Sequence, residues 1–428
     1  MSGSILFVSS HSYGTGRLAV ALADRVLTPG VRIAGVGLHA GGIDPCLEAV
    51  LWEFGINPEK IRPRTLDQVA VEEFDTRIAL SDEAAEELTK QGLTFEQWDV
   101  RAAAESAQPA SIESEKLVLM RSIRDELLVS LEQLHERIKP PPAIGILGGS
   151  GFYDLPGVSD VREIAVTTPY GEPSDVYLEG TFAGRRVVFL PRHGKEHSLL
   201  PFEVNGRANF YGFKRLGVTH VISVSAVGSL REDIEPGDVV LPRQFIDRST
   251  HRPVTFFGEG AVAHVSLADP ICNRVADALA GVARENTDRV HDKGTYISME
   301  GPQFSTRAES ELYRTWGADL VGMTNAPEAR LAREAEICYA TLALPTDYDC
   351  WRSGDAETCV DDILKVLQAN VELSRRIIAG ALAVVDAGVE CSCHRSLDMA
   401  LVTPIERMDA TVRFRLHSIL QRRLRVPA

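Results

Sequence analysis

The chain has 428 residues, and its 44% hydrophobic and 25% charged side chains are typical of a folded globular protein, not of a disordered or fibrous one. A formal net charge of −15 argues against general binding of nucleic acids or anionic membranes, because both need clustered Lys and Arg. The N-terminus lacks a signal-peptide pattern and no apolar run is long enough to cross a bilayer, so we expect a cytoplasmic protein with neither a membrane nor a nucleic acid partner.

Three consecutive prolines mark the clearest boundary in the chain. Residues 139–142 read Lys-Pro-Pro-Pro, which cannot continue a helix and holds the backbone extended. A chain of this length also favours two compact domains over one. We therefore predict an N-terminal domain over residues 1–138, a proline linker over 139–142 and a C-terminal domain over 143–428.

Strands and helices alternate along the first domain. The apolar runs predict strands over residues 5–8, 31–36 and 76–80, and helices over 15–27, 45–54, 82–91 and 113–138. The last of these is a long amphipathic helix that closes the domain. Alternation of this kind predicts an α/β fold with a doubly wound parallel sheet.

The second domain also mixes helices with buried strands. Strands are predicted over residues 143–147, 187–190, 220–224, 238–241 and 340–344. We expect a second, larger α/β domain with a mixed sheet.

Three predicted strands of this domain run into segments rich in hydrogen-bond donors. The segments are Gly148-Gly-Ser-Gly151, Pro191-Arg-His-Gly194 and Ser223-Val-Ser-Ala-Val-Gly-Ser229. Glycines let backbone amides approach an anion, and an Arg adds charge-assisted hydrogen bonds. Each segment alone is common in ordinary loops, but the three together would form a cradle for an oxyanion.

Longer segments of the second domain resemble 5′-methylthioadenosine phosphorylases. The segments lie at residues 217–222, 228–238, 244–250, 300–309, 315–319 and 346–351, the last reading Thr-Asp-Tyr-Asp-Cys-Trp. The resemblance implies a purine nucleoside phosphorylase domain that cleaves a nucleoside with inorganic phosphate as co-substrate and needs no cofactor.

Position by position, the resemblance also implies the site residues. For phosphate it implies Ser150, Arg192, His193, Ser225, Ala226 and Thr324. For the nucleoside it implies Phe304 and Ser305 at the base, Met323 at the ribose, Val360 and Ile363 at the 5′ group, and His264 contributed by a neighbouring subunit. The last residue belongs to an expected homotrimer or dimer of trimers.

Two carboxylates, Asp347 and Asp349, are implied at the base. One of them can act as general acid toward N7 of the leaving purine, while the other accepts from its exocyclic amine. An Asp favours adenine, whereas relatives that cleave 6-oxopurines have Asn there, and an apolar 5′ pocket suits a methylthio group. Methylthioinosine, a 5′-halogenated adenosine and inosine remain alternative substrates, and a non-catalytic nucleoside-binding regulator is a further alternative.

The seven cysteines are scattered along the chain, apart from Cys391-Ser-Cys393. With no second pair at metal-ligand spacing, we expect no metal site. Whether Cys391 and Cys393 form a disulfide is left open.

The first domain resembles low-molecular-weight tyrosine phosphatases and arsenate reductases from residue 5 to residue 138. The family's catalytic Cys is replaced by Ser9, and its acidic loop by Arg101-Ala-Ala103. The next arginine, Arg17, follows after seven residues instead of five. A Ser hydroxyl is not ionised near neutral pH, so we expect no catalysis. An anion or nucleotide sensor built on residues 9–12, an oligomerisation element, a docking module and a retained scaffold all remain open.

Overall fold

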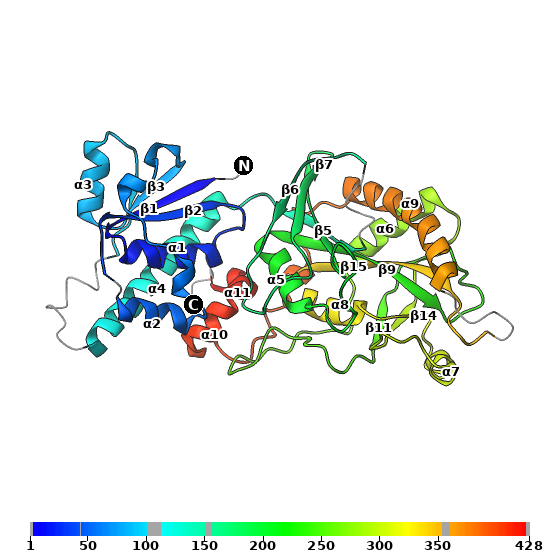
Figure 1. Ribbon diagram of the computed structural model, residues 1–428. Coiled ribbons are helices and arrows are strands. Elements are labelled where there is room, and N and C mark those ends of the chain that lie inside the picture. The colour runs from blue at the N-terminus through cyan, green and yellow to red at the C-terminus, as the bar shows by residue number, and fades with distance from the viewer. Residues whose placement is uncertain (1–2, 43, 101–112, 150–155, 353–359, 425–428) are drawn as a thin grey trace. The chain divides into compact units, whose positions relative to one another are not determined.

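The computed structural model describes residues 3–42, 44–100, 113–149, 156–352 and 360–424, which form two compact units (Figure 1). The first unit comprises residues 1–140 and 413–417, and the second comprises 141–412 and 418–428. The sequence had assigned residues 413–417 to the C-terminal domain. They group with the first unit because the ring of Phe414 stacks on Phe54 with 4.1 Å between centroids, a distant pairing that no local pattern indicates.

The first unit is built on a parallel sheet with the strand order β2-β1-β3-β4. Its strands are β1 (Ser4–His11), β2 (Arg32–His39), β3 (Thr76–Ala79) and β4 (Glu96–Gln97). Its helices are α1 (Thr15–Val26), α2 (Pro45–Glu53), α3 (Asp82–Lys90) and α4 (Glu113–Ile138), with 3₁₀ turns at Pro58–Lys60, Leu66–Gln68 and Val71–Glu73. The predicted doubly wound α/β arrangement is confirmed for this unit.

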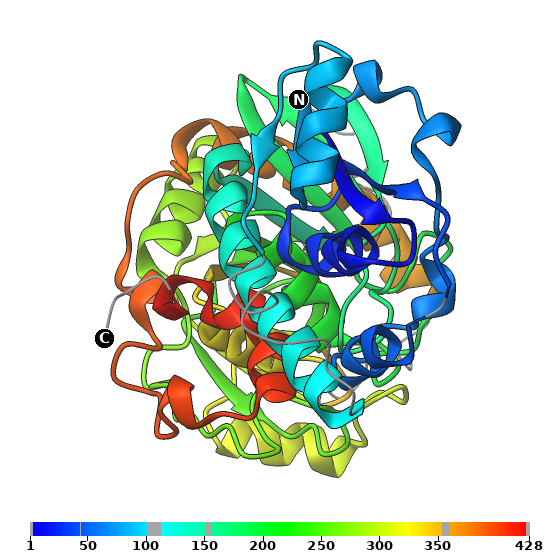
Figure 2. The same ribbon diagram turned by 90° about the vertical axis from the view of Figure 1, so that its left-hand side faces the viewer.

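Alternating side chains of β1 enter two hydrophobic cores, one on each face of this sheet. Ile5 and Phe7 pack with α1, α2 and α4, whereas Leu6 and Val8 pack with α3. The period of two residues follows from the pleat of a strand, and a strand buried on both faces is apolar throughout. The long helix α4, seen along its length in Figure 2, packs with α1 and α2 in one of these cores.

The second unit contains a mixed sheet of eleven strands. The strands are β5 (Ala143–Gly148), β6 (Val158–Ile164), β7 (Tyr177–Phe182), β8 (Arg185–Pro191), β9 (Val218–Ser229), β10 (Val239–Val240), β11 (Gln244–Asp247), β12 (Val290–His291), β13 (Thr295–Ser298), β14 (Leu320–Gly322) and β15 (Cys338–Asp347). The main path runs β11-β13-β14-β9-β5-β8-β7-β6, and β15 pairs with both β9 and β10. The expected mixed sheet is therefore confirmed.

Helices cover both faces of this larger sheet (Figure 1). The helices of this unit are α5 (Gly206–Arg215), α6 (Asn273–Asn286), α7 (Arg307–Thr315), α8 (Asn325–Glu334) and α9 (Val360–Val384), with 3₁₀ turns at Ser392–Arg395 and Ile405–Arg407. Two further helices, α10 (Ala410–Arg415) and α11 (His417–Leu424), contain most of residues 413–417, which group with the first unit. In Figure 1, α6 and α9 lie on one side of β15 and β9, and α5 and α8 lie on the other. The central strands are therefore shielded from water, which explains their continuous apolar runs.

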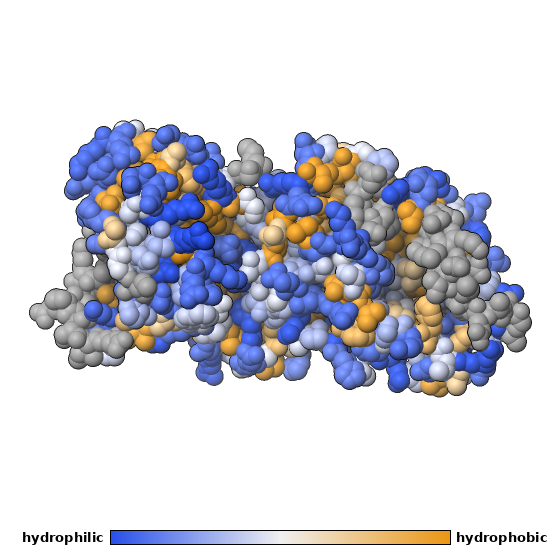
Figure 3. Space-filling view, in the orientation of Figure 1, coloured by the Kyte–Doolittle hydropathy of each residue, from blue (hydrophilic) through white to orange (hydrophobic). Residues whose placement is uncertain are grey.

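No helix within the described ranges is long and apolar enough to span a membrane. On the face shown in Figure 3, hydrophobic residues lie in small groups among hydrophilic ones.

Candidate active site

The carboxyl ends of four parallel strands meet at one edge of the larger sheet. In the register of this sheet, Gly148 of β5 pairs with Pro191 of β8, Leu344 of β15 pairs with Ala226 of β9, and Asp347 pairs with Gly228. Ends of parallel strands share an edge, and ligands of open α/β sheets bind at that edge. The donor-rich segment that follows β8 and the one that ends β9 are thus brought to one place, beside the end of β5.

Arg192 is the first charged residue at this edge, and it is buried, with 4% of its surface exposed. Its Nε donates to Glu328 Oε1 at 2.5 Å, Nη1 donates to the carbonyl of Val224 at 3.0 Å, and Nη2 donates to Ser223 Oγ at 2.6 Å. Its own amide donates to the carbonyl of Gly148 at 2.9 Å. Arg192 therefore ties the ends of β5, β8 and β9 to α8.

Glu328 is the centre of a buried polar network that the sequence did not indicate. Besides Arg192, its Oε2 accepts from Ser223 Oγ at 2.8 Å, Asn325 Nδ2 at 3.1 Å and the Tyr339 hydroxyl at 2.7 Å. Such a network holds its members rigidly when all are satisfied. In the sequence, Glu328 could have been noticed as an acidic residue in the first turn of a helix whose other residues are mostly buried.

Ser225 and Thr324, two predicted phosphate ligands, both contact the hydroxyl group of Tyr296. The hydroxyl of the buried Tyr296 lies 3.4 Å from Ser225 Oγ and accepts the amide of Thr324. Burial raises the pKa of Tyr296, so it stays a neutral phenol at this edge. Gly322 is required beside it, because a Cβ there would lie 2.0 Å from the Tyr296 hydroxyl. Ala226 is exposed at the same edge, so the strand end is accessible to a ligand.

His193 is held as a neutral imidazole. Burial, assisted by the positive charge of Arg192, lowers its pKa to about 4. Nδ1 lies 2.8 Å from the carbonyl of Leu199 and therefore carries the proton, which leaves Nε2 as an acceptor. An acceptor beside an Arg suits an anion that carries a proton of its own, such as a phosphate oxygen.

The depressed pKa predicts a pH dependence of stability. Between pH 6.5 and about 4, the unfolded chain binds more protons at His193 than the folded chain does. The free energy of unfolding should therefore decrease as the pH falls through this window. We expect His193→Gln to flatten this dependence in thermal melts recorded from pH 7 to pH 4. An identical slope for the wild type and His193→Gln would show that His193 titrates normally.

Asp347 and Asp349 lie close together at the end of β15. Asp347 Oδ1 accepts the amide of Asp349 at 2.7 Å, and its Oδ2 accepts the Thr346 hydroxyl at 2.8 Å. Burial raises the pKa of Asp347, and burial together with the charge of Asp347 raises that of Asp349. Both carboxyl groups thus keep a proton to higher pH than an exposed Asp, which suits a general acid.

The loop that carries the two carboxylates is anchored on two sides. Trp351 Nε1 donates to the carbonyl of Ser229 at 2.8 Å, and Cys350 Sγ lies 3.2 Å from the carbonyl of Ser305. Asp349 in turn accepts from Ser305. A Cβ at Gly228 would lie 3.2 Å from Asp347 Oδ1, so a larger residue there would press on the carboxylate. Ser305 therefore lies beside the carboxyl group of Asp349.

Met323 and Phe304, the other described residues predicted at the nucleoside, lie on two segments joined by Arg252. The Arg252 guanidinium donates to the carbonyls of Met323 and Glu300. The Met323 thioether packs on Gly301, where a Cβ would lie 2.6 Å from Sδ. The Phe304 ring is 56% exposed.

Three predicted site residues receive no structural account. Ser150 lies outside the described residues, and Val360 and Ile363 lie in α9 where only the helix itself is described. His264 is exposed on the single chain, and its amide donates to the carbonyl of Ala400 at 2.8 Å. The roles of these four residues, like those of the other predicted site residues, stay predictions.

Comparison with known proteins shows which family the second unit resembles. The Phosphorylase superfamily matches residues 143–383. An S-methyl-5′-thioadenosine phosphorylase of Geobacter sulfurreducens is 52% identical over 278 residues, which span 65% of this chain and 97% of that protein. The chain belongs to the phosphorylase superfamily. Another S-methyl-5′-thioadenosine phosphorylase, from Hyperthermus butylicus, is 49% identical over 263 residues, spanning 60% of this chain and 95% of the relative.

Solved structures of phosphorylases agree with this assignment. The crystal structure of a methylthioadenosine phosphorylase from an Antarctic soil metagenomic library has a TM-score of 0.63 and 48% identity, covering 65% of this chain and 98% of its own. A methylthioadenosine phosphorylase from Schistosoma mansoni in complex with adenine has a TM-score of 0.56 and 39% identity, covering 60% of this chain and 96% of its own. The phosphorylase family match does not include residues 1–142.

In the first unit, Ser9 lies near the end of β1 and is not a free nucleophile. The Ser9 hydroxyl is buried and donates to the carbonyls of His11 and Val36 at 3.0 and 3.3 Å. The Arg17 guanidinium donates to the carbonyls of Ile61 and Pro58 and pairs with a Glu, so its charge is committed to protein groups. Neither residue is arranged for attack on a phosphate ester.

We therefore predict that the full chain does not hydrolyse aryl phosphates and that Ser9→Cys does not restore this activity. The physical reason is that Arg17 follows position 9 after seven residues instead of five, and that the acidic loop of the low-molecular-weight phosphatases is replaced by Arg101-Ala-Ala103. Colorimetric release of p-nitrophenol from its phosphate tests both chains. Turnover by the wild type that disappears in Ser9→Ala would contradict the prediction.

Proposed function

We propose that this chain catalyses the phosphorolysis of 5′-methylthioadenosine, giving adenine and 5-methylthioribose 1-phosphate. The supporting observation is the pairing of a phosphate-like cradle, centred on Arg192 and His193, with the buried carboxyl groups Asp347 and Asp349 at one strand edge. The relatives that share this unit are named for the same activity.

The chemistry follows from the bond that is cut. A phosphate oxygen forms a bond to C1′ while the bond from C1′ to N9 breaks, and the ribosyl group carries positive charge in the transition state. Arg192 and the donors of Ser225 and Thr324 hold the phosphate below C1′. Asp347 or Asp349 transfers a proton to N7, so the purine leaves as a neutral base. The residues form no covalent intermediate with the sugar.

Base choice rests on Asp347. A carboxylate accepts a hydrogen bond from a 6-amino group, whereas it repels the O6 of a 6-oxopurine. Adenine nucleosides are thus favoured over inosine and methylthioinosine. A 5′-halogenated adenosine satisfies the same base contact and remains the second candidate substrate.

The test is release of free base from a panel of nucleosides, followed by chromatography with phosphate present or withheld. We expect adenine from 5′-methylthioadenosine only when phosphate is present. Release without phosphate would identify a hydrolase, and binding without release would identify a nucleoside-binding regulator.

We further propose a homotrimer, alone or paired into a dimer of trimers, in which His264 reaches the 5′ group in a neighbouring subunit. The exposed position of His264 supports this role, because the side chain is available to a partner. An apolar 5′ group needs walls on several sides, and a symmetric interface can supply one of them.

Solution mass of the full chain should correspond to three or six copies. His264→Ala should raise the KM for 5′-methylthioadenosine by about 10-fold, on the scale of a few contacts in a pocket, without changing the mass or the KM for phosphate. An active monomer at assay concentration would exclude the shared site.

A further inference from the structure

Four cysteines that are far apart in the sequence meet in the second unit. The Sγ atoms of Cys272, Cys338, Cys391 and Cys393 all lie within 4.8 Å of one another. Cys272, Cys338 and Cys393 are buried, Cys391 is partly buried, and all four are free thiols. The sequence argued against a metal because Cys391 and Cys393 had no second pair nearby. The fold supplies that pair from the start of α6 and the start of β15.

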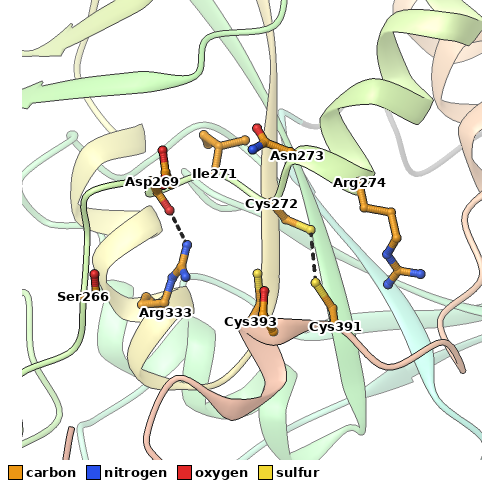
Figure 4. A pocket seen from close by; sticks show the side chains of 10 residues that line it. Ser266, Asp269, Ile271, Cys272, Asn273, Arg274, Arg333, Cys391 and Cys393 are labelled. Atoms are coloured by element: carbon orange, nitrogen blue, oxygen red, sulfur yellow. Dashed lines mark hydrogen bonds between the residues drawn. The ribbon is translucent and has the colours of Figure 1, made fainter. Parts of the chain in front are cut away.

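The spacing of the sulfur atoms fits one tetrahedral ion. Zinc bound by four thiolates at ~2.3 Å requires sulfurs roughly 3.8 Å apart. The Cys272 and Cys391 sulfurs lie 3.8 Å apart, and Figure 4 shows them directed toward each other with Cys393 beside them. A disulfide would need about 2.0 Å, which is much shorter than this spacing.

Backbone and imidazole N–H groups are directed at these sulfurs. The amide of Val275 donates to Cys272, and that of His394 donates to Cys391. His394 Nδ1 accepts the amide of Cys391, so its Nε2 carries the proton. This Nε2 lies 3.2 Å from the carbonyl of Thr219 and 3.4 Å from Cys338 Sγ, which share the donor. Thiolates bound to a metal are stabilised by such donors around the ligand set.

The surroundings also offset the charge of a tetrathiolate site. Zinc with four thiolates carries a net charge of about −2. Cys272 is the N-cap of α6, whose N-terminus is positive. Arg274 and Arg333 outnumber the one acidic residue, Asp269, in the lining of a cavity of about 410 Å³ beside the thiols. The same cavity is lined by Cys272, Cys391 and Cys393, so an ion has a route to the sulfurs.

We propose that Cys272, Cys338, Cys391 and Cys393 bind one structural zinc ion. The ion joins three segments: the start of α6, the start of β15 and the turn at Ser392–Arg395. Cys338 and Asp347 are the first and last residues of β15, so the ion lies at the opposite end of that strand from the carboxylates. It therefore stabilises the fold and takes no part in phosphorolysis.

Metal analysis of the full chain, purified with a non-thiol reductant and no chelator, tests this proposal. We expect about one zinc per chain, and less than about a tenth of that in Cys338→Ser and Cys393→Ser. Cys46→Ser is the matched control, because Cys46 is a buried thiol of the first unit, and it should keep the zinc. Cobalt added to the zinc-free chain should give the intense visible bands of tetrahedral thiolate coordination, and removal of zinc should lower the thermal midpoint reversibly.

A thiol count on the unfolded wild type works even if the variants fail to fold. With zinc bound, all seven cysteines react with a thiol reagent after unfolding in chelator without reductant. Two disulfides within the four-cysteine cluster would leave three reactive thiols and a mass lower by about four hydrogens, and this result would overturn the proposal. Seven thiols with no metal in the purified chain and no cobalt bands would overturn it as well.

Discussion

Replacing Arg192 with alanine is expected to weaken phosphate binding and to destabilise the second unit at the same time. In the proposed complex the Arg192 guanidinium pairs with phosphate as well as with Glu328, and truncating one partner of a buried, hydrogen-bonded charge pair costs about 2–5 kcal/mol. The KM for phosphate should therefore rise by about 100-fold or more. Removing the cation also leaves the carboxylate of Glu328 buried without its charged partner, so the thermal midpoint should fall.

A double variant separates the two effects. Arg192→Ala combined with Glu328→Gln removes the unpaired charge, because a neutral amide can still bond Ser223, Asn325 and Tyr339. This chain should recover part of the lost thermal midpoint but none of the phosphate affinity. Phosphate saturation curves and melts on the wild type and both variants make the comparison. A normal KM for phosphate in Arg192→Ala would remove Arg192 from the site.

A milder change in the same network serves as a control. Ser223→Ala deletes one hydroxyl that bonds both Arg192 and Glu328 but leaves the charge pair intact. A single neutral hydrogen bond is worth about 1 kcal/mol, so the KM for phosphate should change by less than about 10-fold.

Local patterns were sufficient to predict the central strands of the sheet and the polar segments at their ends. The run Ala143–Gly148 is apolar on both faces because helices cover both faces, and such a run can be read without knowing its neighbours. Parallel strands end at a shared edge, so the amino-acid sequence alone was enough to expect the segment of Arg192 beside the end of β9. The place of Asp347 at the base came from the resemblance to 5′-methylthioadenosine phosphorylases and stays a prediction.

The contacts that hold those residues could not be predicted in the same way. Glu328 lies 136 residues from Arg192, and Cys272 lies 119 residues from Cys391. The local sequence around a single Glu in a helix, or a single Cys at the start of a helix, does not indicate which distant residue it contacts. Phe414, which joins the first unit from the far end of the chain, was assigned to the wrong unit for the same reason.

Asp347→Asn is expected to reduce kcat/KM for 5′-methylthioadenosine by about 10² to 10⁴, the usual contribution of a positioned general acid. An amide of the same shape cannot transfer a proton to N7, and its NH₂ group cannot accept from the 6-amino group. It can donate to O6, so the variant is expected to release hypoxanthine from inosine or methylthioinosine.

Stability should move in the opposite direction to activity. Burial raises the pKa of Asp347, so the folded chain binds more protons there than the unfolded chain, and ionisation above the raised pKa costs folding free energy. That cost grows as the pH rises from the pKa of Asp347 in the unfolded chain toward neutrality. It is absent in Asp347→Asn, which has no carboxyl group at this position. The thermal midpoint of Asp347→Asn at pH 7 should therefore lie above that of the wild type, and the difference should shrink toward pH 4.

Asp349→Asn is the matched control, because Asp349 is also partly buried, has a raised pKa and lies two residues away. If Asp347 alone contacts the base, Asp349→Asn should weaken proton transfer, because the two carboxyl groups then no longer share protons. It should not gain activity on 6-oxopurine nucleosides. Base release from adenine and 6-oxopurine nucleosides, with melts at pH 4 and pH 7 on all three chains, decides the matter. Unchanged adenine release in Asp347→Asn would place Asp347 away from the base. A lower midpoint at pH 7 would show that the hydrogen bonds of its carboxylate to Thr346 and to the amide of Asp349 outweigh the cost of burying its charge.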